Sequence, residues 1–222
     1  MSKVLVISAH LDDEVLGAGG TMARHAMEGD EVHVLNICDR SERHRFDADM
    51  VAMLRAQARK MAKIIGVKEL HHGKLADEYL DISLADVIRP IEEVVEKIQP
   101  SIIYTHHKGD VNQDHRAIFE ATLVATRAFT YPFIERVFSY EVLSSTEQAP
   151  ASLPGWQFAP NHFVDINKTL KQKIRGMECY KSEYNGFPFP RSEKGIRTLA
   201  HFRGMACGRE AAEAFELIRW IR

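Results

Sequence analysis

A short apolar run that ends in one histidine and three acids does most to define this chain. Val4 to Ile7 predicts a buried strand, and His10, Asp12, Asp13 and Glu14 follow it. In an open α/β sheet, ligands bind at the carboxyl ends of the strands. Adjacent carboxylates there are costly unless a cation offsets their charge, and the simplest cation is a divalent metal held by His10 and one aspartate. The other aspartate would then be free for proton transfer. The plainer alternative is that Asp12 or Asp13 caps the next helix.

Predicted strands and helices alternate through the first two thirds of the chain. Because βαβα order implies a parallel sheet covered on both faces, we predict an α/β, Rossmann-like three-layer fold with a mostly parallel sheet. Residues 1–222 show no internal repeat and are expected to form a single domain. The expected strands are 3–8, 31–37, 69–71, 101–105, 136–142 and 163–166. The expected helices are 15–27, 46–65, 83–98 (kinked at Pro90), 114–128, 167–183 and 192–205.

Charge and composition exclude several classes of partner. The formal net charge of −2 predicts neither nucleic-acid binding nor attraction to an anionic membrane. Met1 leads directly into a strand pattern without a signal peptide, and no apolar run approaches the roughly 20 residues of a membrane span. The three cysteines are widely spaced and form no CxxC motif. We therefore expect a cytoplasmic protein that acts on a small molecule, with homo-oligomerisation left open.

A second polar cluster follows the expected strand 101–105. It contains His106, His107, Asp110, Asp114 and His115. Because the exits of parallel strands share one edge of the sheet, this cluster is expected beside the first. Two imidazoles and one carboxylate with an open position are typical of a catalytic zinc site. The alternative is that these histidines only cap or decorate a loop.

These motifs together resemble those of a known family. Residues Ala9 to Glu14 match the hallmark Ala-His-Pro-Asp-Asp-Glu, and the following glycines (Gly17, Gly19 and Gly20) and Asp114-His115 fit the same pattern. The chain thereby resembles the zinc-dependent N-deacetylases of the phosphatidylinositol glycan class L type, also called LmbE-like. The likeness extends to the tail around Pro190-Arg191-Ser192.

The resemblance implies one zinc ion per chain, bound by His10, Asp13 and His115, with Asp12 as general base. Leu11 replaces the usual proline, which leaves the ligand spacing unchanged. Asn112 stands where many members have a histidine that stabilises the oxyanion. An asparagine amide can donate a hydrogen bond but cannot deliver a proton. The acid role is thus open between Asp12 after it has accepted a proton, His107 and Asp110.

The activity implied by the resemblance is hydrolysis of the N-acetyl group of an amino sugar. The sugar would belong to a sugar nucleotide, a glycolipid precursor or a small glycoside. Candidate substrate contacts are Arg40, in an arginine-rich loop suited to a phosphate, Asp77, and Arg191 in the tail. Their plainer roles would be a solvated loop, a turn, and an anchor for the C-terminal helices. For Phe187 and Phe189, core anchoring is favoured over a lid.

Three rival functions stay open. The first is an amidase that cleaves a larger acyl or thiol conjugate at the same site, which pocket size would decide. The second is a nucleotide-binding α/β protein without hydrolytic activity. A nucleotide-binding loop would normally show GxGxxG spacing, which the stretch from Gly17 to Gly20 lacks. Close packing of a helix against the sheet explains these glycines better. The third is an inactive metal-binding protein, which Asn112 keeps open.

Overall fold

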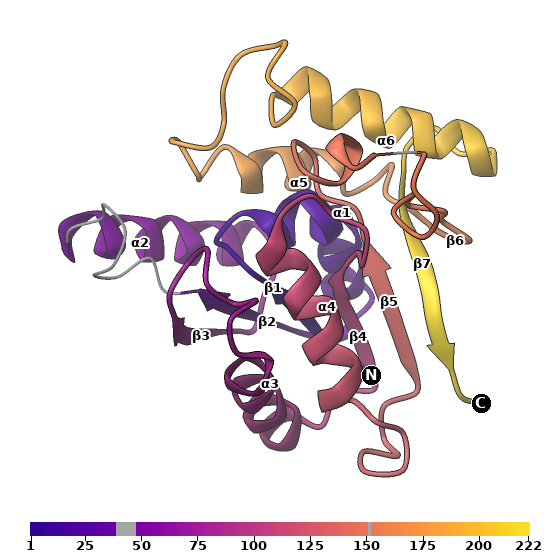
Figure 1. Cartoon of the computed structure of the whole chain (residues 1–222). Helices are drawn as coiled ribbons and strands as arrows, with labels where there is room; N and C mark the ends of the chain where they lie inside the picture. Colours follow the sequence, from indigo (N-terminus) through magenta and orange to yellow (C-terminus); the bar gives the residue numbers. More distant parts are fainter. Residues whose placement is uncertain (39–47, 151) are drawn as a thin grey trace.

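One seven-stranded sheet with the order β3-β2-β1-β4-β5-β7-β6 forms the centre of the molecule (Figure 1). The computed structural model describes residues 1–38, 48–150 and 152–222. The first five strands are parallel, whereas β7 is antiparallel to both β5 and β6. The strands are β1 (Lys3–Ser8), β2 (Glu31–Cys38), β3 (Glu69–Leu75), β4 (Ile102–His106), β5 (Arg136–Tyr140), β6 (His162–Asp165) and β7 (Ala212–Trp220).

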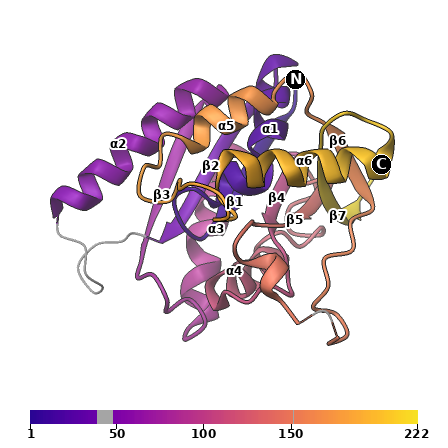
Figure 2. The ribbon, with the colours of Figure 1, turned by 90° about the horizontal axis from the view of Figure 1, so that it is seen from above.

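Helices cover both faces of the sheet, as Figures 1 and 2 show. Alternate residues of β1 enter the two cores: Val4 and Val6 pack on the side of α1, α2, α5 and α6, while Leu5 and Ile7 pack on the side of α3 and α4. The predicted three-layer, mostly parallel α/β fold is confirmed. The helices are α1 (Asp13–Met27), α2 (Ala48–Ile65), α3 (Leu84–Ile98), α4 (Gln113–Ala125), α5 (Leu170–Met177) and α6 (Glu193–Cys207), with a 3₁₀ turn at Thr146–Gln148. Within the described residues, no helix has both the length and the apolar character that a bilayer crossing requires.

The C-terminal third differs most from expectation. Strand β7 was not predicted, and the helix expected over 167–183 is the shorter α5. Charged residues interrupt the apolar pattern of β7, and one of them, Glu213, lies buried. Pro90 lies inside α3, which extends beyond it to Ile98.

A buried ion pair joins this C-terminal part to α1. The Lys173 ammonium lies 2.6 Å from the Glu213 carboxylate and donates a second bond to the carbonyl of Leu16. The backbone N–H groups of Gly20 and Thr21 also donate to Glu213. Both side chains of the pair are about 5% exposed, so each depends on the other for its charge to be tolerated.

We expect Lys173→Met to lower the free energy of unfolding by about 3–5 kcal/mol, because it leaves the Glu213 charge buried without its cation. Urea denaturation would measure the loss. The matched control is Arg197→Met, which breaks the exposed pair with Glu193 and should change stability by less than about 1 kcal/mol. Equal effects of the two substitutions would contradict an anchoring role for the buried pair.

Close packing of α1 against β5 explains one glycine. A Cβ atom at Gly17 would lie 2.1 Å from the Tyr140 ring, which is fully buried and whose hydroxyl donates to the carbonyl of Ile7. Because that ring cannot move aside, Gly17→Ala is expected to destabilise the protein by about 1–3 kcal/mol. Gly186→Ala is the control, since its Cβ would meet no atom within 4 Å. Denaturation midpoints would compare the two, and an unaffected Gly17→Ala protein would contradict the packing.

Candidate active site

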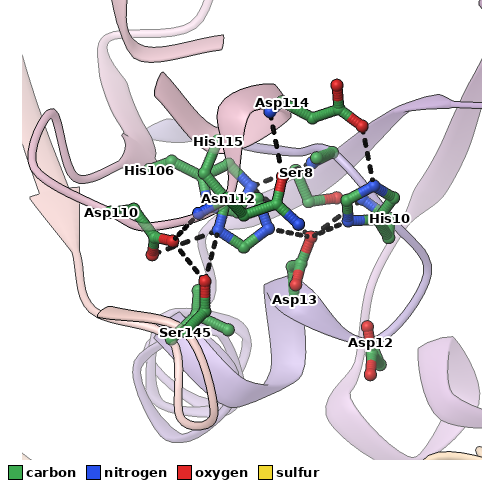
Figure 3. A network of polar contacts seen from close by, with 12 residues as sticks. Ser8, His10, Asp12, Asp13, His106, Asp110, Asn112, Asp114, His115 and Ser145 are labelled. Carbon is green, nitrogen blue, oxygen red and sulfur yellow. Dashed lines mark hydrogen bonds and ion pairs between the residues drawn. The ribbon is translucent and has the colours of Figure 1, made fainter. Parts of the chain in front are cut away.

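The carboxyl ends of four strands surround a cavity of about 340 Å³. Two segments contribute most of its reactive groups: the turn after β1 and the loop after β4 (Figure 3). Short stretches after β3 and β5 line two further sides, and Glu183 and Arg191 reach the cavity from the chain before α6. The principal lining residues are His10, Asp12, Asp13, Asp77, Asn112, His115, Ser145 and Arg191.

Three of the expected metal ligands meet at one point. The Oδ2 atom of Asp13 lies 3.2 Å from Nδ1 of His10 and 3.3 Å from Nε2 of His115. These spacings match the edges of a tetrahedron built from metal bonds of about 2.0–2.1 Å. Nε2 of His115 is buried and has no hydrogen-bond partner among the described residues. The donor set therefore fits a divalent metal ion of the zinc type.

The electrostatics of this group also favour a cation. Burial opposes a charged His115, but Asp13 and Asp110 outweigh it and raise its pKa to about 9. The pKa of His10 is raised in the same way, against burial, by neighbouring aspartates that include Asp114. Without a metal, these raised pKa values favour protonated imidazoles beside Asp13. Metal binding at this point would displace those protons.

His115 is oriented from its far side by a carboxylate. Its Nδ1 atom lies 3.1 Å from Oδ2 of Asp110. Asp110 in turn accepts hydrogen bonds from the hydroxyls of Ser145 and Thr146, which follow β5. A carboxylate on the second ring nitrogen fixes the tautomer and increases the basicity of a metal-binding histidine. The neighbouring strand therefore supports the ligand supplied by α4.

His10 has the same kind of support. Its Nε2 atom lies 2.7 Å from Oδ1 of Asp77 and 3.1 Å from Oδ2 of Asp114. Asp114 also accepts the backbone N–H groups of Glu78 and Leu80, which ties the segment after β3 to α4. Asp77 thus lies in the cavity as expected, and it contacts a candidate ligand as well as the space for substrate.

Asp12 lies beside the three candidate ligands in a strained backbone conformation. Its φ and ψ are 117° and −30°, which non-glycine residues adopt only under constraint. It occupies the N-cap position of α1, but its side chain makes no capping bond, so capping does not explain the Asp12 carboxylate. Burial and the charge of Asp13 raise the pKa of Asp12 to about 8, against the lowering effect of Arg191. A carboxylate of this kind can both accept and release a proton near neutral pH.

Arg191 holds Asp12 in place from the C-terminal segment. Its Nη1 atom lies 2.7 Å from Oδ2 of Asp12 and 2.7 Å from Oε2 of Glu183. The guanidinium also lies over the ring of Phe189, 5.3 Å from its centroid. Phe187 is 60% exposed, so the expectation of core anchoring is wrong for this residue, whereas Phe189 is half-buried. The segment instead places a charged residue over the site.

Asn112 caps α4 with its side-chain oxygen. That oxygen accepts a hydrogen bond of 2.9 Å from the backbone N–H of Asp114. The amino group of the same carboxamide is thereby kept as a donor at the cavity wall. The position is compatible with the expected contact to a developing oxyanion.

Two other expected residues do not lie in the cavity. His107 is buried against Glu216 and the carbonyl of Trp156, at 3.1 Å and 3.3 Å, and is not part of the cavity lining. The alternative in which His107 acts as the acid is therefore wrong. Asp110 contacts His115 and is committed to orienting it. The expected contact at Arg40 falls in 39–47, outside the described residues.

A family model described as PIG-L, GlcNAc-PI de-N-acetylase, matches residues 5–126. The chain belongs to the PIG-L family. The matched segment contains the three candidate ligands, Asp12 and Asn112, while Arg191 lies beyond it. The resemblance identified from the motifs is confirmed.

Known relatives of this PIG-L chain include enzymes of two kinds. Diacetylchitobiose deacetylase of Thermococcus kodakarensis is 25% identical over 100% of this chain and 85% of its own. 4-Oxalmesaconate hydratase of Pseudomonas putida is 26% identical over 80% of this chain and 72% of its own. Among solved structures, N,N'-diacetylchitobiose deacetylase from Pyrococcus horikoshii superposes with a TM-score of 0.78 at 21% identity, covering 98% and 84% of the two chains. The last likeness supports the fold.

Glu14 is a feature of this PIG-L site whose role the sequence did not reveal. It is completely buried and accepts hydrogen bonds from the hydroxyl of Tyr180, at 2.6 Å, and the amide of Asn36, at 3.1 Å. The backbone N–H of Asp12 also donates to it, at 3.2 Å. Burial raises its pKa to about 7. Glu14 thus braces the strained turn at Asp12, and only its place in the acidic motif could have indicated this.

Proposed function

We propose that this chain is a zinc-dependent hydrolase that removes the acetyl group from an N-acetylated amino sugar. The observation that carries the proposal is the convergence of His10, Asp13 and His115 with Asp12 alongside. A dication bound by this set would polarise an amide carbonyl and lower the pKa of a water molecule from about 16 towards 7. Zinc suits mixed imidazole and carboxylate ligation, although iron, cobalt and nickel would also bind.

The residues around the ligands would move the protons and stabilise charge. Asp12 accepts a proton from the attacking water and delivers it to the leaving amine, since its pKa lies near neutrality. Arg191 keeps the Asp12 carboxylate directed into the cavity through its 2.7 Å contact. Asn112 donates its amide N–H to the carbonyl oxygen as that oxygen becomes negative. The products would be acetate and a free amino sugar.

Cavity size favours a single sugar over a large conjugate. The volume of about 340 Å³ lies at the lower end of the range of roughly 300–1,000 Å³ for small-molecule sites. This counts against the amidase that cleaves a larger acyl or thiol conjugate. It is compatible with an N-acetyl hexosamine ring, and the deacetylases among the relatives support that class.

The charge of the lining favours a neutral substrate. Asp77, Glu78 and Glu183 face the cavity together with the aspartates of the ligand turn, and these carboxylates suit sugar hydroxyls better than phosphate. Arg191 is the one Lys or Arg among the described lining residues, and two carboxylates already pair with it. We therefore favour a small glycoside over a sugar nucleotide. The same negative charges disfavour a substrate that carries several carboxylates, which is the kind of substrate named for the Pseudomonas hydratase.

The test is metal analysis of the purified protein together with acetate release from a panel of substrates. The panel would contain N-acetylglucosamine, its β-glycosides, diacetylchitobiose, a nucleoside-diphosphate N-acetyl sugar and, for the hydratase reaction, an unsaturated tricarboxylate. We expect about one catalytic metal ion per chain and acetate release from the neutral sugars. Activity on the unsaturated acid alone would overturn the proposal, as would a full set of negative assays with metal bound.

Asn112→Asp separates the two roles of Asn112. The aspartate keeps a capping oxygen for α4 but replaces the N–H donor with an acceptor. We expect kcat to fall by about 10²–10³-fold while the denaturation midpoint stays unchanged. Asn112→Ala is the companion variant: it should lose the same activity and also about 1 kcal/mol of stability. Full activity in Asn112→Asp would exclude Asn112 as an oxyanion donor.

A further inference from the structure

A second group of side chains that could bind a metal lies at the amino ends of β2 and β3, whereas the candidate active site lies at the carboxyl ends of the strands. His33 stands near the start of β2, and Glu69 and His71 stand on β3, the strand at one end of the sheet (Figure 1). Glu69 is directly opposite His33 in the parallel register, and His71 is opposite Leu35. Because residues two apart on a strand share one face, both β3 side chains meet His33 on the α3 side of the sheet.

The three donor atoms form a nearly regular triangle. Nδ1 of His33 lies 3.4 Å from Nε2 of His71 and 3.8 Å from Oε2 of Glu69, and the last two atoms are 3.6 Å apart. Edges that average 3.6 Å correspond to tetrahedral bonds of about 2.2 Å, which is within about 0.2 Å of the zinc–nitrogen bond length. Two imidazoles and a glutamate are also a known zinc donor set.

The surroundings hold these donors ready for a metal. The side chains of His33 and His71 are 5% and 9% exposed, and burial lowers the pKa of both, so neutral rings are favoured. Lys97 binds the other oxygen of Glu69 at 2.7 Å and so directs Oε2 to the histidines. Glu69 itself is 45% exposed, which leaves a path for an ion from solvent.

One buried atom of this group has no partner. Nε2 of His33 has no hydrogen-bond partner among the described residues, and the nearest carboxylate oxygen, Oε2 of Glu31, is 3.9 Å away. When a metal binds Nδ1 of a histidine, the other nitrogen carries a proton and normally donates it to a carboxylate. A metal bound to Nδ1 would therefore fix the imidazole proton on Nε2, and Glu31 could accept a hydrogen bond from it after a small movement.

We propose that His33, Glu69 and His71 form a second transition-metal site, separate from the active site, which binds zinc with one coordination position open to solvent. An ion there would link β3, the outermost strand, to its neighbour β2. Because Asp77 follows two residues after the end of β3, the ion would stiffen the strand that leads to the active site.

The experiment compares metal stoichiometries in variants of the full chain. His10→Ala removes a residue shared by both metal-ligating groups at the catalytic edge, so any zinc it still binds lies elsewhere. Chelator-stripped proteins would be titrated with zinc chloride by calorimetry, and cobalt(II) would serve as the optical probe. We expect two zinc ions in wild type, one in His10→Ala and His71→Ala, and none in the double variant.

Two controls make the outcome decisive. In the His10→Ala background, Glu69→Gln should weaken zinc binding by more than about tenfold, whereas His201→Ala, on the exposed face of α6, should leave it unchanged. Zinc at a hundredfold excess over its dissociation constant should raise the Tm of His10→Ala by about 5–10 °C and leave the double variant unaffected.

Failure of this proposal is distinguishable from failure of the proposed function. No zinc in His10→Ala, or equal zinc in His10→Ala and the double variant, would overturn the second site and leave the active site untouched. If His10→Ala does not fold, the comparison of wild type with His71→Ala decides: two ions against one supports the site, and equal numbers refute it.

Discussion

His115→Ala is expected to lose the catalytic metal ion and at least about 10³-fold of acetate release. The imidazole supplies one of three donor atoms that surround a single point, and alanine leaves only His10 and Asp13. Removing residues that merely support metal ligands already lowers affinity or activity by about 10–100-fold, so removal of a ligand should exceed this. Metal analysis after dialysis and a steady-state assay would measure the two losses together.

The matched control for His115→Ala is His201→Ala. His201 lies on α6, is exposed and contacts the carbonyl of Glu210. That substitution should leave metal content and turnover at the level of wild type. If His115→Ala kept its catalytic metal ion and lost no more than about tenfold in activity, His115 would not be a ligand.

Asp12→Asn is expected to keep the metal ion and lose about 10²–10⁴-fold in kcat. The range is that of general acid–base catalysis, since asparagine has the shape of aspartate but cannot take up the proton. The asparagine oxygen can still accept the hydrogen bond from Arg191 that holds this side chain. The loss should therefore appear in kcat, with metal content unchanged.

Glu183→Gln is the control for Asp12→Asn. It alters the other carboxylate on Arg191 while leaving the candidate base unchanged, and we expect less than about tenfold loss of activity. More than about a tenth of wild-type activity in Asp12→Asn would mean that another group is the base. Loss of metal from Asp12→Asn would mean that Asp12 is needed for metal binding and that its role as a base is not tested by this variant.

The sequence predicted best the strands that are buried on both faces of the sheet. Both faces of β1 are covered, so its apolar run is continuous and easily identified. Strand β7 escaped prediction because Glu213 occupies a buried position that Lys173 and the backbone N–H groups of Gly20 and Thr21, all distant in the sequence, make tolerable. A local pattern of apolar residues contains no information about such a pair.

The active site could be predicted as far as its local motifs extend. The parallel topology predicted that the two strand exits meet, and the resemblance implied His10, Asp13 and His115 as the candidate ligands among the residues there. The bond between Asp110 and His115 depends on the path of the loop, and the fixing of Asp110 by Ser145 depends on a further strand. Arg191 was expected near the site through the resemblance, but its partnership with Asp12 became visible only in three dimensions.

The ion pair between Arg191 and Asp12 shows that the site is built from two separate parts of the polypeptide. The candidate metal ligands lie within residues 5–126, the segment that the family model matches, whereas Ser145, Glu183 and Arg191 come from later in the chain. A substitution in the later part can reshape what approaches the base without altering a single metal ligand. We therefore expect that exchanging the segment after residue 126 between family members would change the substrate range while keeping the candidate metal ligands in place.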